Sequence, residues 1–130
     1  MATYLQGLNE QQEEAVLHKD GPLMIIAGAG SGKTKVLTTR ITHLMSAHGV
    51  DAFNILALTF TNKAAAEMKQ RIEKTLGNSE ARNLYVGTFH SVFARILRFE
   101  ANIYNLPEKN PHLSNERIDG GRVNVRTFKI

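Results

Sequence analysis

A glycine-rich loop between an apolar run and a helical pattern constrains this chain more than any other feature. Residues 27–34 read AGAGSGKT, with three glycines ahead of Lys33 and Thr34. The apolar run at residues 23–27 is typical of a strand buried on both faces. Glycine permits backbone angles that turn successive amides toward one anion, and the following helix adds unpaired amides and a positive dipole end. The sequence therefore predicts a strand, a phosphate-binding loop and a helix, in this order.

The residues that close the loop indicate a nucleotide site. Lys33 is placed to reach the β- and γ-phosphates, and the Thr34 hydroxyl can ligate Mg²⁺, so we expect both to be catalytic and Thr34 to be the metal ligand. The strict pattern begins with glycine, and this chain has Ala27 there. The alternative, a flexible surface turn, does not explain why lysine and threonine open the helix. Kinases, GTPases, transporters and helicases all use such a loop.

Two helical patterns flank the first strand. Residues 9–18 have Asn9 as a candidate N-cap and Gln12 three positions later, which is the spacing of a capping box. After the loop, an apolar stripe runs to Gly49, which can end a helix in the left-handed conformation. The members of this stripe are Val36, Leu37, Ile41, Leu44 and Met45.

The same alternation then repeats. A short apolar strand at residues 54–60 precedes a helix that Asn62 caps and Gly77 ends, and a strand at 84–88 precedes a third amphipathic helix. The side chains expected to face inward from these helices are Ala64, Ala65, Met68, Ile72 and Leu76, then Phe89, Val92, Phe93, Ile96 and Leu97. This pattern predicts an α/β fold with a parallel sheet flanked by helices.

Composition excludes several classes of protein. The chain has no cysteine, so neither disulfides nor cysteine-based metal sites are possible. Its start lacks the features of a signal peptide, and no apolar run approaches the roughly 18 residues of a membrane span. We therefore expect a soluble, cytoplasmic monomer without a membrane partner. The net charge of +4 mildly favours polyanionic partners.

Three further segments narrow the function: LNEQQEEAV at 8–16, LALTFTNKAAAEMKQRI at 56–72 and VGTFHS at 86–91. Together with the glycine loop they resemble the N-terminal motor domain of the UvrD/Rep/PcrA group of superfamily 1 DNA helicases. The resemblance covers residues 8–104, with the motifs in the family's order and at similar spacing. It implies a RecA-like P-loop NTPase domain that binds ATP, Mg²⁺ and single-stranded DNA.

The resemblance also implies roles in ATP binding. Gln12 corresponds to the glutamine that reads the adenine edge, for which a side-chain amide supplies both a donor and an acceptor. Lys35 stands where many relatives have arginine, whose planar group can stack on adenine as lysine cannot. The other implied ATP-binding residues are Ala27, Gly28, Ala29, Gly30, Ser31, Gly32, Lys33 and Thr34.

Two motifs resemble those that contact single-stranded DNA in the family. Hydroxyls and helix N-terminal amides can bind phosphates, and Phe60 can stack on a base, although core packing at a strand end is an equal alternative for Phe60. A lone histidine is more often structural than functional, and its place in the second motif favours a role for His90. The implied DNA-binding residues are Thr59, Phe60, Thr61, Asn62, Lys63, Thr88 and His90, in motifs that also contain Gly87, Phe89 and Ser91.

ATP hydrolysis in such enzymes also needs a carboxylate pair at the end of a neighbouring apolar strand. None of Asp20, Asp51 and Asp119 follows an apolar strand. The chain thus resembles an N-terminal piece of the motor domain at residues 1–104, truncated before the Walker B strand, with a divergent tail at 105–130. We expect ATP and DNA contacts but little or no turnover, and marginal stability unless the alternating segment 122–128 fills the place of the missing strand.

Two other interpretations stay open. A P-loop kinase would need an acceptor-site acid and an arginine-rich lid, and it would leave the TFTNKAA segment unexplained. A non-catalytic nucleic-acid-binding fragment would carry a vestigial loop. ATP affinity that depends on Lys33, together with salt-sensitive binding of single strands, separates these interpretations from the helicase.

Overall fold

The computed structural model describes residues 2–104 and 126–129. The helices are η1 (Thr3–Leu5), α1 (Glu10–Leu17), α2 (Lys33–His48), η2 (Ala52–Asn54), α3 (Asn62–Leu76), α4 (Asn78–Ala81) and α5 (Phe89–Tyr104), of which η1 and η2 are single 3₁₀ turns. The strands are β1 (Leu23–Ile26), β2 (Leu56–Thr59), β3 (Tyr85–Thr88) and β4 (Arg126–Lys129). The alternation of strand and helix expected from the sequence is confirmed.

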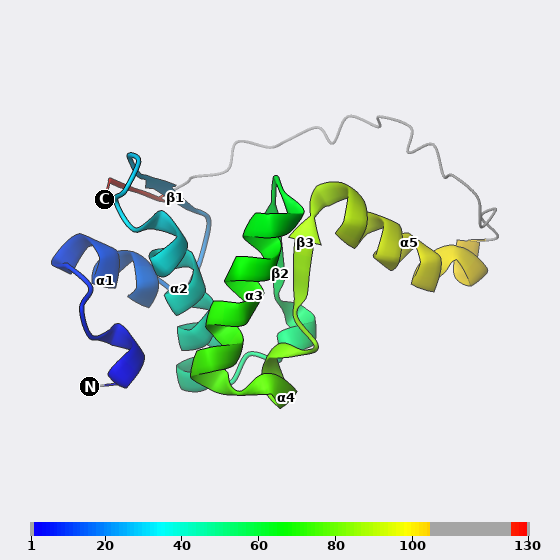
Figure 1. The fold of residues 1–130 in the computed structure, drawn as a ribbon, viewed down its shortest axis with the longest axis horizontal. Helices are drawn as coiled ribbons and strands as arrows, with labels where there is room; N and C mark the ends of the chain where they lie inside the picture. The colour runs from blue at the N-terminus through cyan, green and yellow to red at the C-terminus, as the bar shows by residue number, and fades with distance from the viewer. Residues whose placement is uncertain (1, 105–125, 130) are drawn as a thin grey trace.

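The strands form two parallel pairs instead of the one sheet that the sequence predicted. β1 pairs with β4, with Leu23 opposite Arg126, and β2 pairs with β3, with Leu56 opposite Tyr85. Among the described residues no ladder joins β1 to β2. Contacts between α2 and α3 connect the parts of the molecule that contain the two strand pairs (Figure 1). The fold is therefore a small α/β arrangement of parallel strand pairs and helices.

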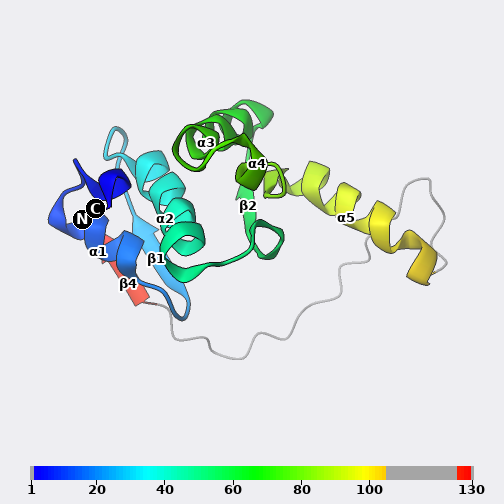
Figure 2. The same cartoon turned by 90° about the horizontal axis from the view of Figure 1, so that it is seen from below.

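The tail contributes one described element. Residues 126–129 form β4, which runs parallel to β1 and lies beside it in both views (Figure 1, Figure 2). The segment 122–128 was expected to be an edge strand, and residues 122–125 lie outside the described residues. β4 therefore occupies one edge of the strand that leads into the glycine loop.

The helix ends follow from local side-chain chemistry. The capping box is confirmed, because Asn9 Oδ1 accepts from the Gln12 amide at 2.8 Å and the Asn9 amide donates to Gln12 Oε1 at 3.0 Å. Gly49 ends α2 with a φ of +62°. The expected cap of α3 at Asn62 is wrong by one position. Thr61 has the extended backbone of a cap, and its hydroxyl accepts from the Ala64 amide at 3.1 Å.

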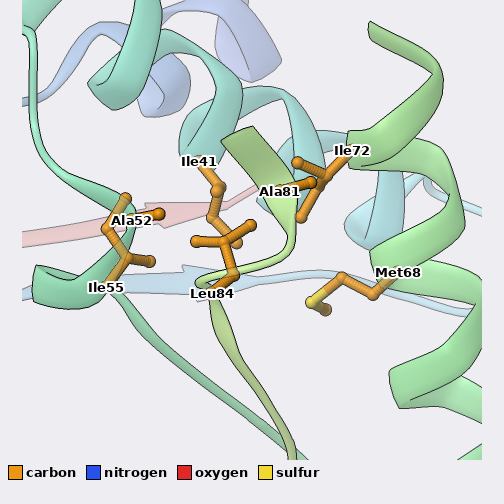
Figure 3. Close-up of a cluster of buried hydrophobic side chains, with 7 residues drawn as sticks. All are labelled: Ile41, Ala52, Ile55, Met68, Ile72, Ala81 and Leu84. Atoms are coloured by element: carbon orange, nitrogen blue, oxygen red, sulfur yellow. The ribbon is translucent and has the colours of Figure 1, made fainter. Parts of the chain in front are cut away.

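Two apolar clusters hold the helices in place. The larger cluster lies where α2, η2, α3, α4 and the chain around β3 meet (Figure 3), and it consists of Ile41, Ala52, Ile55, Met68, Ile72, Ala81 and Leu84. The smaller one joins α1 to α2 through Ala15, Val16 and Val36. Burial of a side chain as large as Ile72 contributes roughly 1.5–3 kcal/mol to folding, so these clusters fix α2 and α3, which follow the glycine loop and β2.

Three apolar side chains, two on β1 and one on α2, are more exposed than the sequence predicted. Burial alternates along β1, and Met24 and Ile26 are each about half exposed, so the strand is covered on one face only. Leu37 is 43% exposed although it follows the fully buried Val36, which faces α1. A continuous apolar run cannot by itself distinguish a strand covered on one face from one covered on both.

The helix α5 extends away from the rest of the molecule (Figure 1, Figure 2). Val92 is buried, but Phe89 and Phe93 are 49% and 39% exposed, which contradicts the expectation that both face inward. The main contacts of α5 are with β2 and β3, near its own start, so few neighbours are available to cover its apolar stripe. Of the helices within the described residues, none has both the length and the apolar character that crossing a membrane requires.

Candidate nucleotide and nucleic-acid site

The glycine loop leaves the end of β1 and enters α2 at Lys33. Gly30 and Gly32 have left-handed backbone angles, with φ of +75° and +81°, which side chains other than glycine rarely adopt. Both the amide of Ser31, at 3.3 Å, and its hydroxyl, at 2.7 Å, donate to the carbonyl oxygen of Gly28. The loop is therefore closed as a tight turn immediately before the helix.

The first turn of α2 supplies donors for an anion. The Val36 amide donates to the Gly32 carbonyl at 3.0 Å, so the amides of Lys33, Thr34 and Lys35 precede the first helical bond. The Lys33 side chain is exposed, and the Thr34 hydroxyl forms no hydrogen bond within the part of the chain that the structure describes. These groups fit a phosphate chain and a Mg²⁺ ion, as the motif requires.

Gln12 connects the loop to α1. Its Nε2 donates to the Ser31 carbonyl at 2.8 Å, while its Oε1 accepts from the Asn9 amide. A primary amide has two N–H groups and two lone pairs, so one donor and one acceptor remain for an adenine edge. A Cβ at Gly32 would lie 3.0 Å from Gln12 Nε2, so this glycine also allows the close approach. No local pattern predicts this contact, because the two residues are 19 positions apart.

Lys35 and Arg40 attach the preceding segment to α2. Lys35 Nζ donates to the Gly7 carbonyl at 2.6 Å, so the residue expected near the adenine holds the chain just ahead of α1. Arg40 Nη1 donates to the carbonyl oxygens of Ala15, at 2.9 Å, and His18, at the end of α1. Burial lowers the pKa of the Arg40 guanidinium. A positive group at a helix C-terminus satisfies carbonyl groups that have no partner within the helix. The contacts of Lys35 with Gly7 and of Arg40 with the end of α1 were not predicted from the sequence.

The two motifs assigned to DNA begin at the same edge of the β2–β3 pair. The register places Thr59 opposite Thr88, so the parallel strands bring both motifs together at their carboxyl ends. The Thr59 hydroxyl donates to the Thr61 carbonyl at 2.9 Å. Thr88 Oγ1 accepts from the Ser91 amide at 3.3 Å at the start of α5. This edge therefore carries the N-termini of both α3 and α5.

An exposed aromatic surface lies at this edge. Phe60 is 95% exposed, so the alternative that it packs in the core is wrong. Its ring centroid lies 6.4 Å from that of Phe89, which in turn lies 6.5 Å from the nearly parallel ring of Phe93. Lys63, three residues after Phe60, and His90, directly after Phe89, are also exposed. The edge thus combines aromatic faces, a cation and helix N-terminal amides.

Gly87 allows α5 to start so close to β3. A Cβ at this position would lie 2.7 Å from Ser91 Oγ and 2.8 Å from Val92 Cγ2. Real Cβ atoms essentially never come this close to other atoms, so any larger residue would force the Ser91 and Val92 side chains to move. The glycine of the second motif is therefore explained by packing.

The aspartates do not form a catalytic pair in the described residues. Asp20 is exposed ahead of β1, and Asp51 accepts from the Phe53 amide at 2.9 Å as the cap of η2. Asp119 lies outside the described residues. No group of three or more histidines, aspartates or glutamates able to hold a metal occurs in the described ranges.

The site geometry agrees with the comparison to known families. Residues 8–126 match the UvrD/REP helicase N-terminal domain. The chain belongs to this family. The resemblance expected from the four motifs is confirmed. The matched residues include β1, β2 and β3 and end at Arg126, the first residue of β4.

Curated relatives of this chain are named ATP-dependent DNA helicases. It is 59% identical over 97 residues to UvrD1 of Mycobacterium tuberculosis, covering 75% of this chain and 12% of the relative. It is 58% identical over 94 residues to PcrA of Bacillus subtilis, covering 72% and 13%. With PcrA of Staphylococcus aureus, identity is 43% over 142 positions, covering 98% and 19%. The chain therefore spans less than one fifth of the length of these relatives.

Proposed function

We propose that this chain is the ATP-binding, single-stranded-DNA-contacting part of an ATP-dependent DNA helicase. The proposal rests on one arrangement above all. The glycine loop ends in the free amides of α2, and the two other motifs meet at the carboxyl edge of β2 and β3, with Thr59 opposite Thr88. The names of the relatives support the same activity.

In this proposal the loop binds the phosphates of ATP. The amides at the start of α2 and the Lys33 ammonium hold the phosphate chain, and the Thr34 hydroxyl ligates Mg²⁺. The ion supplies neutralisation of phosphate charge when it is bound. The Gln12 amide, held by Ser31 and Asn9, uses its remaining donor and acceptor on the adenine edge.

The edge of β2 and β3 binds the DNA strand. Phe60 stacks on a base, and the hydroxyl of Thr61 and the α3 amides, with Asn62 and Lys63, contact phosphates. Thr59 holds this turn in place, because its hydroxyl donates to the Thr61 carbonyl. Thr88 and His90 extend the contact at the start of α5. Stacking tolerates any base, so this surface binds single strands without strong sequence preference.

The complete motor requires more than these residues. Since the chain spans 12 to 19% of the relatives' length, we assign a continuous RecA-like sheet, the carboxylate pair and the second motor domain to the whole protein. There, ATP hydrolysis drives translocation and unwinding in the cytoplasm. We expect the purified 130-residue chain to retain ATP and DNA contacts with little or no turnover, and unwinding by this chain would contradict that assignment.

Binding of a fluorescent oligothymidine, measured by anisotropy over a salt series, tests the DNA part. Affinity should fall steeply as salt rises, because phosphate contacts release counterions. Lys63→Gln should reduce the slope by about 0.7, the value for one phosphate contact on a single strand. Lys69→Gln, on the same helix but away from the edge, should leave the slope unchanged. Absence of binding at about 50 mM salt would contradict the proposal and favour a kinase.

A further inference from the structure

A polar cavity lies between η1, α2 and α3, away from the edge of β2 and β3. Its volume is about 550 Å³. The lining residues are Thr3, Tyr4, Lys35, Thr38, Thr39, Thr42, Arg71, Lys74 and Thr75. The members from α2 and α3 recur at helical spacing. Thr38, Thr39 and Thr42 are buried, whereas Lys35, Arg71, Lys74 and Thr75 are exposed. This composition requires an explanation other than core packing.

The charge of the cavity is of one sign. Lys35, Arg71 and Lys74 line it, and no aspartate or glutamate does. Within the described residues none of the three forms an ion pair. All three side chains are exposed, so water weakens their mutual repulsion without removing it. An anion inside the cavity would remove this repulsion.

The hydroxyl groups separate into two kinds. Thr38, Thr42 and Thr75 each donate to a carbonyl of their own helix, so none of these three has a proton left for a ligand. Thr39 is different. It is 9% exposed, it lines the cavity, and its hydroxyl has no hydrogen-bond partner among the described residues. Because its proton is not used within the described part of the chain, this hydroxyl can donate to a ligand in the cavity.

We propose that this cavity binds a small phosphate-bearing anion at a site separate from the glycine loop. Arg71, Lys74 and two remaining N–H groups of Lys35 provide charged donors, and Thr39 provides a neutral one. The volume lies within the roughly 300–1,000 Å³ of typical ligand pockets. Tyr4 closes one side, because its hydroxyl is held 3.1 Å from His43 Nδ1. Enclosure by three elements suits a compact anion better than a continuous strand.

Calorimetric titration with tripolyphosphate tests the site. The titration uses a Lys33→Ala background, in which binding at the glycine loop is weakened. One site should remain in this background. Adding Arg71→Gln or Lys74→Gln should weaken binding about tenfold each, as the loss of one charged hydrogen bond predicts. Thr39→Val, which keeps the shape and removes the donor, should weaken it less. Lys69→Gln, which removes the same charge outside the cavity, should have no effect.

Three outcomes would overturn the proposal. The first is absence of tripolyphosphate binding in the Lys33→Ala chain, and the second is an equal loss with Lys69→Gln. In the third, the Arg71 and Lys74 variants lose affinity for oligothymidine but not for tripolyphosphate. This result would place the cavity on the path of the DNA strand. Circular dichroism melting confirms that each variant is folded. The result does not depend on ATP binding at the loop, because the Arg71, Lys74 and Lys69 variants are compared in the same Lys33→Ala background.

Discussion

Gln12 Nε2 donates to the carbonyl oxygen of Ser31 at 2.8 Å, and this bond joins α1 to the phosphate-binding loop. The same side chain completes the capping box at the start of α1 through Asn9. One residue thus stabilises a helix end and positions the loop. A nucleotide that also contacts Gln12 would meet a side chain that is already oriented.

Substitution of Gln12 should separate these two roles. Gln12→Ala removes the Ser31 bond and half of the capping box, so affinity for a fluorescent ATP analogue should fall about tenfold. Asn9→Ala removes the cap and keeps the Ser31 bond, so it should cost about 1 kcal/mol of stability with little loss of affinity. Gln11→Ala, at an exposed neighbouring position, is the matched control. Equal affinities for Gln12→Ala and Gln11→Ala would show that the bond does not position the loop.

Phe60 should contribute to DNA binding without contributing to the fold. It is 95% exposed, so Phe60→Ala should leave the thermal midpoint nearly unchanged. Affinity for oligothymidine should fall by about 1–3 kcal/mol, the range for loss of one base stack. Phe53→Ala, which removes a 59% exposed ring at η2, is the control and should not change DNA affinity. A loss of stability without a loss of DNA binding would assign Phe60 to packing after all.

Local patterns predicted the elements well. The capping box of Asn9 and Gln12 and the end of α2 at Gly49 depend only on neighbouring residues, so the sequence was sufficient for both. These features use short-range geometry that a single sequence contains.

Long-range packing was not predictable in the same way. The alternation of exposed Met24 and Ile26 depends on which elements cover β1, and an apolar run gives no information about that. The bonds from Arg40 to the end of α1 and from Lys35 to Gly7 join positions more than 20 residues apart. Phe93 was expected to face inward together with Val92, but among the described residues α5 contacts mainly β2 and β3, near its own start.

The stability of the fold should decrease in mild acid. Burial, and then the charges of His48 and Arg40, lower the pKa of His43. The unfolded chain therefore binds more protons once the pH falls below the unfolded value of about 6.5, and the folded state loses stability there. Thermal melts from about pH 7.5 to about pH 5.5 should show this loss. His43→Gln should reduce it and exposed His90→Gln should not. Identical pH profiles for the two variants would exclude His43 as the cause.

The isolated chain should be only marginally stable. Within residues 2–104 and 126–129 each sheet has two strands, and Met24, Ile26, Phe53 and Leu56 are each about half exposed. Strand pairs of this size have little stability of their own and depend on the helices that pack against them. The thermal midpoint should lie below about 60 °C, toward the lower part of the mesophilic range. A cooperative transition above that temperature, followed by circular dichroism, would show that β4 and the two apolar clusters compensate.

The central claim is that the loop of residues 27–34 binds ATP through Lys33. Titration of the 130-residue chain with a fluorescent ATP analogue and Mg²⁺, beside the Lys33→Ala variant, tests it most directly. The account predicts saturable binding that weakens at least about tenfold in the variant, since one charged contact to phosphate is lost. Lys19→Ala, an exposed lysine ahead of β1, should bind as the unmodified chain does. Equal affinity of the unmodified chain and Lys33→Ala, or no binding by either, would contradict the claim.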